Sequence, residues 1–399
     1  MHILMIAPEP FFEPRGTPFS EFHRIRALTT LGHTVDLVTY PFGRDVELPG
    51  LTIHRCQRPP FVRHVRIGPS WTKVPLDLAL ALTACRLALT RRYDAVHSHE
   101  EGGTIGVVLS WALRKPHLYD MHSSLPQQVE NFGHKGGSWL RTVLGWAERL
   151  MIRRSRVVIV ICQDLETTVR AVDPHVPAIL IENAPGSGDR PSAGSGAAIR
   201  AALGLNATVP IVLYTGTFET YQGLDLLYQA MRVVGRARPD ARLVMVGGDP
   251  AQVAAARARV EALGLGGSVM FTGQRQAEEV PAYLDAATVL VSPRSTGTNT
   301  PLKIYQYLRS GRAIVATRLR THTQVLDEET AILAEPTPEA FGEAIAGAIN
   351  DPARAEAIGR HAREVAEQRY SDEAFIAKTE HAYDVLFGAR PPAVARGVA

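Results

Sequence analysis

The sequence has few cysteines and no long uncharged apolar segment. Three cysteines occur in 399 residues, and they are too widely spaced to form a metal-binding pattern. Such a sparse, odd set is typical of a protein in a reducing compartment, so we expect a cytoplasmic location. No run of about 20 uncharged apolar residues is present, so we predict no transmembrane helix. The amino-terminal stretch is interrupted by Pro8, too early for a signal peptide.

The sequence also lacks a strong charge of either sign. It contains 43 lysines and arginines and 40 acidic residues, a net charge of +3, which does not indicate a nucleic-acid-binding protein. Its apolar content of 45% and charged content of 21% are ordinary for a soluble globular enzyme. One hydrophobic core seldom extends beyond roughly 250 residues, so the length favours two or three domains.

Short apolar runs alternate with amphipathic stretches along the whole chain. His2–Ala7 and Val157–Ile161 are typical of buried parallel strands in a first series, and Ile211–Tyr214 begins a second. Ala184–Gly196, between the two series, is rich in glycine, serine and proline and is typical of a linker. We therefore predict an α/β protein with two Rossmann-like, doubly wound domains facing across a cleft. The expected parts are a first domain over residues 1–184, a linker over 185–197, a second domain over 198–370, and a helix over 371–390 that crosses back to the first domain.

The stretch Ser292–Thr317 has the order strand, polar loop, helix, glycine, strand. Its loop comes at the carboxyl end of the apolar strand and the amino end of the helix Leu302–Arg309. Free backbone N–H groups and the helix dipole favour a phosphate at such a place. Gly297–Thr300 should present these N–H groups, and Lys303 could neutralise the charge of the phosphate.

Two segments of the first domain carry an excess of basic residues. His54–Lys73 has five lysines and arginines and no acid, and Ser138–Arg156 has five arginines and one acid, Glu148. Basic faces interleaved with aromatic residues favour an anionic membrane surface. The alternative is that both segments are basic, solvated flanks of core elements. As a further expectation, the protein binds peripherally to the inner face of the cytoplasmic membrane.

A series of short motifs follows in a characteristic order. The motifs are Gly16-Thr17, GHTV at 32–35, YDAVHSHEEG at 93–102, HLYDMHSS at 117–124, IEN at 181–183, YTGT at 214–217 with QG at 222–223, LVMVGG at 243–248, FTG at 271–273, and the stretch Ser292–Thr317. Together they resemble a family-4 glycosyltransferase of the GT-B type, and the resemblance covers nearly the whole chain.

The resemblance implies an activity and its partners. A sugar would move from a nucleoside-diphosphate sugar to a hydroxyl of a glycan or lipid-linked acceptor, with retention of the anomeric configuration and without a bound metal or cofactor. Nucleic acid is not an expected partner. Two alternatives stay open at this point: a catalytically silent sugar-nucleotide-binding protein, and a nucleotide-sugar epimerase, which would need acid/base carboxylates in the cleft.

The sequence departs from the family at its charged positions. The two glutamates that the family places eight positions apart correspond to Thr298 and Gln306. The arginine and lysine that clamp the diphosphate correspond to Thr217 and Gln222. Lys303 and Arg294 are nearby cations that could take over part of this role.

Site residues are predicted from these motifs. His122 would hold hydroxyls of the transferred sugar, as the resemblance implies, and glycines in the loops would let backbone N–H groups approach the diphosphate. The predicted catalytic residues are His122, Thr298 and Lys303. The predicted donor-binding residues are Gly16, Gly216, Thr217, Gln222, Arg275, Gly297, Asn299, Thr300 and Gln306. The predicted acceptor-side residues are His99 and Glu100.

A metal site is not expected. His97 and His99 share one face of a strand, whereas Glu100 should point away from them. No Asp-x-Asp pair occurs in a suitable loop.

Overall fold

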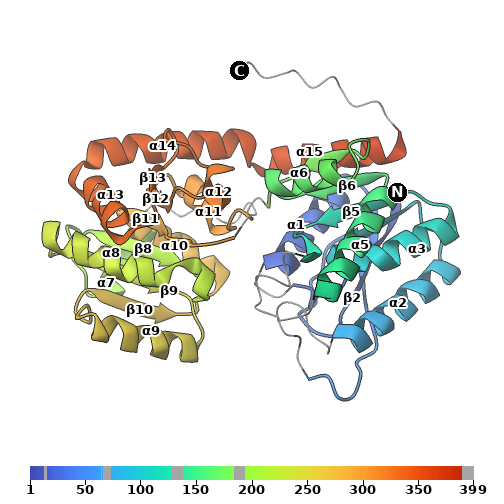
Figure 1. The fold of residues 1–399 in the computed structure, drawn as a ribbon, viewed down its shortest axis with the longest axis horizontal. Helices are drawn as coiled ribbons and strands as arrows, with labels where there is room; N and C mark the ends of the chain where they lie inside the picture. The colour runs from blue at the N-terminus through green and yellow to red at the C-terminus, as the bar shows by residue number, and fades with distance from the viewer. Residues whose placement is uncertain are drawn as a thin grey trace. The chain divides into compact units, whose positions relative to one another are not determined.

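The structure is a computed structural model that describes residues 1–12, 16–63, 65, 73–126, 138–183, 194–297 and 299–388. The chain divides into two compact units (Figure 1). Unit 1 consists of Met1–Asn183 and Glu373–Ala399, and unit 2 consists of Ala184–Asp372.

Unit 1 is built on a seven-stranded parallel sheet with the order β3-β2-β1-β4-β5-β6-β7. The strands are β1 (His2–Ala7), β2 (Thr34–Thr39), β3 (Leu51–Arg55), β4 (Ala95–His99), β5 (His117–Met121), β6 (Val157–Val160) and β7 (Ala178–Leu180). The chain first builds outward from β1 to β3 and then returns to place β4 on the other side of β1. The loops after β1 and β4 therefore diverge, and this switch point is where ligands bind in such sheets.

Helices cover both faces of this sheet (Figure 1). They are α1 (Gly16–Thr30), α2 (Lys73–Thr90), α3 (Gly103–Leu113), α5 (Ser138–Arg154) and α6 (Gln163–Val172), with a short 3-10 turn η1 (Glu100–Gly102) after β4. Helix α2 packs against α3, α3 against α5, and α5 against α6. Leu76, Leu80 and Ala84 of α2 point to the sheet at helical spacing and are fully buried.

The carboxy-terminal helix α15 (Asp372–Phe387) belongs to unit 1, as predicted. Its Lys378 Nζ lies 2.5 Å from Glu182 Oε2, and its Phe375, Ala382 and Leu386 are buried. The return of this helix thus adds α15 to the first unit.

Unit 2 repeats the architecture with a six-stranded parallel sheet of order β10-β9-β8-β11-β12-β13. The strands are β8 (Ile211–Thr215), β9 (Arg242–Val246), β10 (Val269–Gly273), β11 (Val289–Ser292), β12 (Ala313–Thr317) and β13 (Ile332–Ala334). Here the switch point lies between β8 and β11, which are hydrogen-bonded neighbours. The two doubly wound sheets confirm the predicted fold class.

Helices pack on the unit 2 sheet, and a large apolar cluster on one side of it includes Leu227, Met231, Phe341 and Ile345. The helices are α7 (Ser195–Ala202), α8 (Leu224–Ala237), α9 (Pro250–Ala262), α10 (Val280–Ala286), α11 (Lys303–Ser310), α12 (Arg320–Thr323), α13 (Pro338–Asn350) and α14 (Pro352–Arg369), with 3-10 turns η2 (Thr220–Gln222) and η3 (Ala277–Glu279). The predicted linker over 185–197 was wrong at its end, because α7 already begins at Ser195. Gly196 of this helix packs too closely on Asp285 and Ala286 of α10 to admit a side chain, which explains why a glycine- and serine-rich stretch is helical here.

No helix among the residues that the structure describes is long and apolar enough to cross a membrane.

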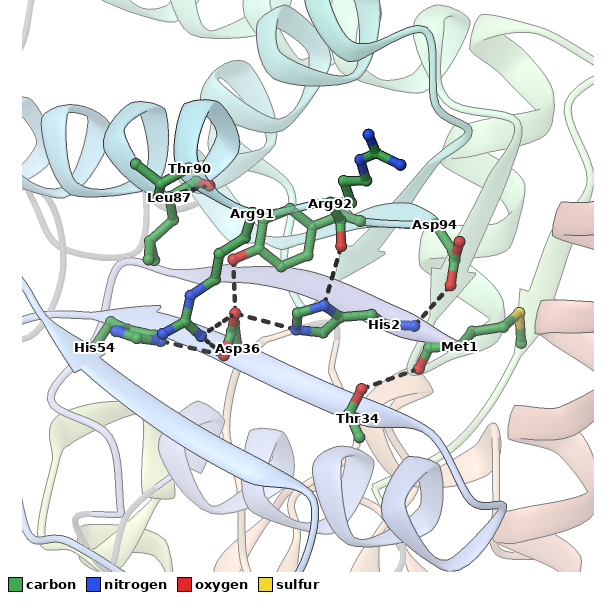
Figure 2. A network of polar contacts seen from close by, with 11 residues as sticks. Met1, His2, Thr34, Asp36, His54, Leu87, Thr90, Arg91, Arg92 and Asp94 are labelled. Carbon is green, nitrogen blue, oxygen red and sulfur yellow. Dashed lines mark hydrogen bonds and ion pairs between the residues drawn. The ribbon is translucent and has the colours of Figure 1, made fainter.

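A polar network around Asp36 joins the first three strands of unit 1 (Figure 2). The Asp36 carboxylate on β2 is 2% exposed and accepts hydrogen bonds from Arg91 Nη1 at 2.8 and 2.9 Å and from Tyr93 OH at 2.6 Å. His2 of β1 and His54 of β3 approach the same carboxylate at 3.1 and 3.2 Å. Burial alone would raise the pKa of Asp36, but the hydrogen bonds from Tyr93, His54 and Arg91 outweigh it and leave this pKa below its usual value.

The variant Asp36→Asn should lower the unfolding free energy at pH 7 by roughly 2–4 kcal/mol, because it removes the charge that four neighbouring side chains share. An ionised group with a lowered pKa stabilises the fold above its usual pKa and loses this effect as the pH falls through the folded-state value. Urea denaturation should therefore show the gap between wild type and variant narrowing below about pH 4. Asp45→Asn, which removes an exposed carboxylate paired with Arg55, is the matched control and should change stability by less than about 0.5 kcal/mol. A constant gap down to pH 2 would contradict this account.

Candidate functional site

In unit 1, charged side chains gather at the carboxyl ends of β4 and β5. Asp120, the fourth residue of β5, is fully buried, and Arg24 of α1 donates from Nε to its Oδ2 at 3.0 Å. His122 Nε2 lies 3.2 Å from Oδ1 of the same carboxylate, in an ion-pair contact. Burial alone would raise the pKa of Asp120, but Arg24 and His122 hold it well below its usual range. Asp120 is therefore ionised at neutral pH.

The three histidines of this cluster lie in one row. His97 and His99, on the same face of β4, stack with their ring centroids 4.8 Å apart, and the ring of His122 follows at 5.5 Å from His99. His97 Nδ1 makes a 2.8 Å hydrogen bond with Tyr383 OH. Burial lowers the pKa of His97 and lowers that of His99 still further, so both rings are neutral at pH 7.

Glu100, at the start of η1, has an unusual backbone conformation. Its φ of 47° lies in the left-handed region, which costs of order 1 kcal/mol or more for a residue with a side chain. The carboxyl group is 6% exposed and accepts a hydrogen bond from Ser123 Oγ at 2.9 Å. Burial raises the pKa of Glu100 to about 8. The predicted acceptor-side residues His99 and Glu100 are thus both buried beside His122.

A second pair of acids lies close to this cluster. Glu21 of α1 is fully buried, and the carboxyl group of Glu9, which follows β1, is near enough to act on it. Burial, and then the neighbouring Glu9, raise the pKa of Glu21 well above its usual value.

His97, His99 and Asp120 are the described residues whose spacing most suits a metal, with ligand atoms within 4.8 Å of one another. Arg24, however, already supplies a cation at 3.0 Å from the Asp120 carboxylate. A metal ion at this position would be repelled by the guanidinium. The donor set therefore fits a hydrogen-bonded network better than a metal site.

In unit 2, the loop after β8 brings its backbone close to Lys303. Gly216 has φ 137°, and a Cβ at this position would lie 3.3 Å from Lys303 Nζ and 3.3 Å from Tyr214 OH. Tyr214 OH in turn donates to Thr217 O at 2.7 Å and so fixes the turn. Gly247 has φ 123° and approaches Gly216 O too closely for any side chain. A glycine at 216 therefore leaves the backbone beside the ammonium group open.

Lys303, the first residue of α11, is a buried cation. It is 8% exposed, and its Nζ lies 3.9 Å from the centroid of the Tyr214 ring. Within the part of the chain that the structure describes, Nζ has no hydrogen-bond partner. Burial, and then the charge of Arg294, lower the pKa of Lys303 well below its usual value. An unpaired ammonium group at this depth has a strong preference for an anionic ligand.

Arg294, in the loop after β11, is a second cation of this site. Its Nη1 donates to Asn299 O at 2.7 Å, and its guanidinium lies over the Tyr221 ring at 5.1 Å. Gly297, with φ 110°, lets the loop fold onto it, since a Cβ there would be 2.9 Å from Arg294 Nη2. Thr321 Oγ1 also donates to Asn299 O, at 2.6 Å. Arg294 thus shapes the loop while its charge acts on Lys303.

Two further predicted donor-binding residues have neutral polar atoms in this site. Gln222 is 8% exposed and donates weakly from Nε2 to Thr217 Oγ1 at 3.5 Å. Thr300 is also 8% exposed, and among the described residues its hydroxyl has no partner. These groups can donate hydrogen bonds but contribute no charge.

The remaining predicted residues are less closely connected. Arg275 follows the edge strand β10, is exposed, and pairs with Glu279 at 3.9 Å. Gln306 is half-buried on α11. Gly16 begins α1, and Thr298 lies outside the described residues. The structure thus brings together Gly216, Thr217, Gln222 and Lys303 but gives Arg275 no contact with them.

Sequence reasoning missed Arg24, Asp120 and the residues of α15 that complete the unit 1 cluster. One signal was present, because Glu21, Arg24 and Leu28 share a helix face at spacings of three and four residues. Two charged residues on the same helix face as an apolar residue indicate that the charged side chains are buried together. Their partners on β5 and α15 had no such signal.

Comparisons with known proteins agree on one group of enzymes. Residues 23–184 match the family described as Glycosyl transferase 4-like domain, and residues 209–351 match Glycosyl transferases group 1. The D-inositol 3-phosphate glycosyltransferase of Segniliparus rotundus is 27% identical over 329 residues, which cover 78% of this chain and 71% of that protein. The GDP-mannose-dependent alpha-(1-6)-phosphatidylinositol monomannoside mannosyltransferase of Mycolicibacterium smegmatis is 31% identical over 158 residues, 38% of this chain and 41% of that one. Sucrose-phosphate synthase from Thermosynechococcus elongatus has a similar fold, with a TM-score of 0.78 and 24% identity over 98% of this chain and 100% of that one.

The variant Lys303→Met should be more stable than the wild type at pH 7, by about 1–3 kcal/mol, because it removes an uncompensated buried charge. A lysine with a lowered pKa binds fewer protons in the folded state than in the unfolded state, so the wild type gains stability as the pH rises toward 10. Thermal denaturation should show the gap between the two proteins closing over this range. Lys115→Met, at an exposed position after α3, is the control and should shift the melting temperature little at any pH. A less stable Lys303→Met protein would show that the ammonium group has a partner in solution.

Proposed function

Because this chain belongs to the family-4 glycosyltransferases of the GT-B type, we propose that it transfers a sugar from a nucleoside-diphosphate sugar to a hydroxyl of a glycan or lipid-linked acceptor, with retention of the anomeric configuration. The observation that carries this proposal is the buried, unpartnered ammonium group of Lys303 beside Gly216. It supplies the charge that a diphosphate leaving group needs. The loops that hold it follow β8 and β11, at the switch point of the unit 2 sheet.

The donor diphosphate is proposed to bind between these two loops. Backbone N–H groups near Gly216 and Gly297 approach the phosphate oxygens, and Thr217 and Thr300 donate from their hydroxyls. Lys303 and Arg294 replace the charged clamp that the family has elsewhere. Gln222 and Gln306 add neutral hydrogen bonds, Gln306 to the ribose.

Catalysis on this proposal is mainly electrostatic. The bond between the anomeric carbon and the diphosphate breaks, positive charge develops on the sugar ring, and Lys303 stabilises the negative charge that collects on the leaving diphosphate. His122 is proposed to bind hydroxyls of the transferred sugar. Thr298 takes the position of a sugar-binding acid. With no clear side-chain nucleophile in the predicted site, the acceptor hydroxyl attacks from the face that the diphosphate leaves, which gives retention.

A bound metal is not part of this proposal. Lys303 and Arg294 provide the positive charge that a divalent ion supplies in other phosphate sites, and Arg24 occupies the carboxylate of the histidine cluster. The chain's own cations therefore suffice for the leaving group.

We propose that the protein reaches its acceptor at an anionic membrane surface. One named relative acts on a phosphatidylinositol monomannoside, a lipid. Helices α2, α3 and α5 of unit 1 lie next to one another, and their outer sides carry exposed large apolar residues. These residues, called here the docking face, are Val74, Leu78, Leu82, Leu89, Val108, Trp111, Trp139, Val143 and Trp146.

Charge at the docking face is of one sign. Among the described residues of the three helices, every charged side chain that is exposed is an arginine: Arg86, Arg141, Arg149, Arg153 and Arg154. The acids of these helices are turned inward, since Asp77 hydrogen-bonds Tyr40 and Glu148 accepts from Leu125 N at 2.8 Å. Tryptophan and leucine between arginines match the boundary between lipid headgroups and acyl chains. Residues 64 and 66–72 of the predicted basic segment over 54–73 lie outside the described residues, so the helices carry the argument.

With three free cysteines, the protein is proposed to work from the cytoplasmic side of that membrane.

The donor prediction is tested with a panel of UDP-, GDP- and ADP-sugars. The purified full-length protein should release the nucleoside diphosphate from one donor, and a chelator such as EDTA should leave the rate unchanged. Lys303→Met should lower kcat by about 100-fold or more, because it removes charge from the leaving-group site. Lys303→Arg should recover part of the loss. Binding of the donor without release of diphosphate would identify a silent sugar-nucleotide-binding protein instead, and isomerised donor would identify an epimerase.

The membrane prediction is tested by co-sedimentation with vesicles of phosphatidylglycerol and phosphatidylcholine. Binding should require the anionic lipid and weaken with salt. The double variant Arg149→Gln/Arg153→Gln should lose about 1 kcal/mol of binding free energy for each cation. Trp111→Ser/Trp146→Ser should weaken binding at all salt concentrations.

The matched control for the membrane experiment is Arg232→Gln/Arg236→Gln on the exposed side of α8 in unit 2. It removes the same charge away from the docking face and should bind as the wild type does. Equal losses in the two arginine double variants would contradict a localised docking face.

A further inference from the structure

A continuous set of contacts connects the carboxy-terminal helix to His122 within unit 1. Thr379 Oγ1 of α15 accepts from Arg24 Nη1 at 2.8 Å, and the Arg24 guanidinium lies over the Phe375 ring at 4.7 Å. Arg24 Nε donates to Asp120 Oδ2 at 3.0 Å, and Asp120 Oδ1 contacts His122 Nε2 at 3.2 Å. All of these side chains are less than 10% exposed.

A parallel set of contacts runs through His97. Tyr383 OH of α15 lies 2.8 Å from His97 Nδ1, and His97 Nε2 lies 3.6 Å from Asp120 Oδ2. The two oxygens of Asp120 thus have different neighbours. Arg24 and His97 lie at Oδ2, and both of these residues also contact α15. His122 lies at Oδ1.

We propose that Asp120 and Arg24 are positioning residues that orient the ring of His122, and that α15 completes this arrangement through Thr379 and Tyr383. The inference rests on the proposed function in one respect, which is that His122 contacts the transferred sugar. None of these four residues is proposed to touch the substrate.

The carboxylate acts on the proton position of His122 through Nε2. An ionised carboxylate only accepts hydrogen bonds, so the Nδ1–H tautomer would place the lone pair of Nε2 against a negative charge at 3.2 Å. The charge of Asp120 therefore favours the neutral His122 tautomer that is protonated on Nε2.

Arg24 is needed because the surroundings of Asp120 are otherwise unfavourable to its charge. The titratable groups that act on this carboxylate are Glu21 on α1, Tyr119, Tyr383 on α15, the rings of His97, His99 and His122, and the Arg24 guanidinium. Arg24 is the permanent cation among these neighbours. Without Thr379, the Arg24 guanidinium would lose its fixed position. The Thr379 hydroxyl accepts from Nη1, whereas Asp120 accepts from Nε.

An ordinary structural ion pair between Arg24 and Asp120 is the simpler explanation, and it predicts a loss of stability alone. A positioning role predicts a change at His122 in a protein that is still folded. The two are separated by measuring the His122 tautomer directly with 15N-histidine-labelled full-length protein, in which His122→Gln assigns the signal.

In wild type, the ring 15N shifts should show His122 protonated on Nε2. Asp120→Asn should abolish this preference and lower kcat about 10- to 100-fold, with a smaller change in KM for the donor. Thr379→Val, a substitution of similar volume, should lower kcat about 2- to 30-fold. Far-UV circular dichroism and the melting temperature establish which variants are folded.

Thr168→Val is the matched control. Thr168 on α6 donates to the carbonyl four residues earlier at 3.0 Å, as Thr379 does at 2.8 Å, but within the described part of the chain it has no hydrogen bond to Asp120, Arg24 or His122. It should leave the tautomer and kcat as in wild type. If Asp120→Asn does not fold, Thr379→Val and Tyr383→Phe carry the test through the same two readouts.

An unchanged His122 tautomer in folded Asp120→Asn, or in both α15 variants when Asp120→Asn does not fold, would overturn the inference whatever the activity. If Thr379→Val and Thr168→Val show the same His122 tautomer and the same kcat, the role of α15 is overturned. A wild type that releases no nucleoside diphosphate, yet shows the Asp120-dependent tautomer, would overturn the proposed function and support the positioning of His122.

Discussion

Both units depend on the geometry of parallel strands whose order reverses once. In a parallel sheet the carboxyl ends of all strands lie at one edge, and where the order reverses the two following loops diverge and leave space between them. In unit 1 these are the loops after β1 and β4, and in unit 2 the loops after β8 and β11. These loops contain Glu9, Glu100, Gly216 and Arg294. The same topological rule therefore determines where the polar residues of both units lie.

The two sites differ in whether a buried charge is compensated by a neighbouring charge. In unit 1, Asp120 is fully buried, but Arg24 compensates its charge and hydrogen bonds tie the pair to a second helix. In unit 2, Lys303 is almost as deeply buried, and its Nζ lies over the Tyr214 ring with no hydrogen-bond partner among the described residues. A compensated charge keeps its surroundings in place, whereas an uncompensated charge lowers stability until an anion arrives. The first arrangement suits positioning and the second suits the binding of a diphosphate.

The departures from the family's charged residues are therefore less damaging than the sequence suggests. The arginine and lysine of the family clamp are absent at Thr217 and Gln222, yet Lys303 reaches the same glycine turn from the start of α11. Arg294 is close enough for its charge to lower the pKa of Lys303. On the proposed function, Lys303 and Arg294 would supply the positive charge that the family places at the positions of Thr217 and Gln222.

The sequence by itself determined the elements and their order. Apolar runs of four to six residues, glycines at loop starts and the polar residues that follow strands are local patterns, and they predicted the two βα series, the return of the last helix, and the loops that hold Gly216, Lys303 and His122. The βα pattern could not reveal α7, since its glycine- and serine-rich start is helical only because Gly196 packs on α10.

Only the tertiary structure decided which side chains meet and which stay without a partner. Arg24 and Thr379 are separated by 355 positions, and no local pattern relates them. Whether Lys303 has a counter-ion, and whether the apolar sides of α2, α3 and α5 lie next to one another, depend on strand order and helix packing. These are set by the burial of the whole core, because contacts between distant segments form only once the sheet has brought them together.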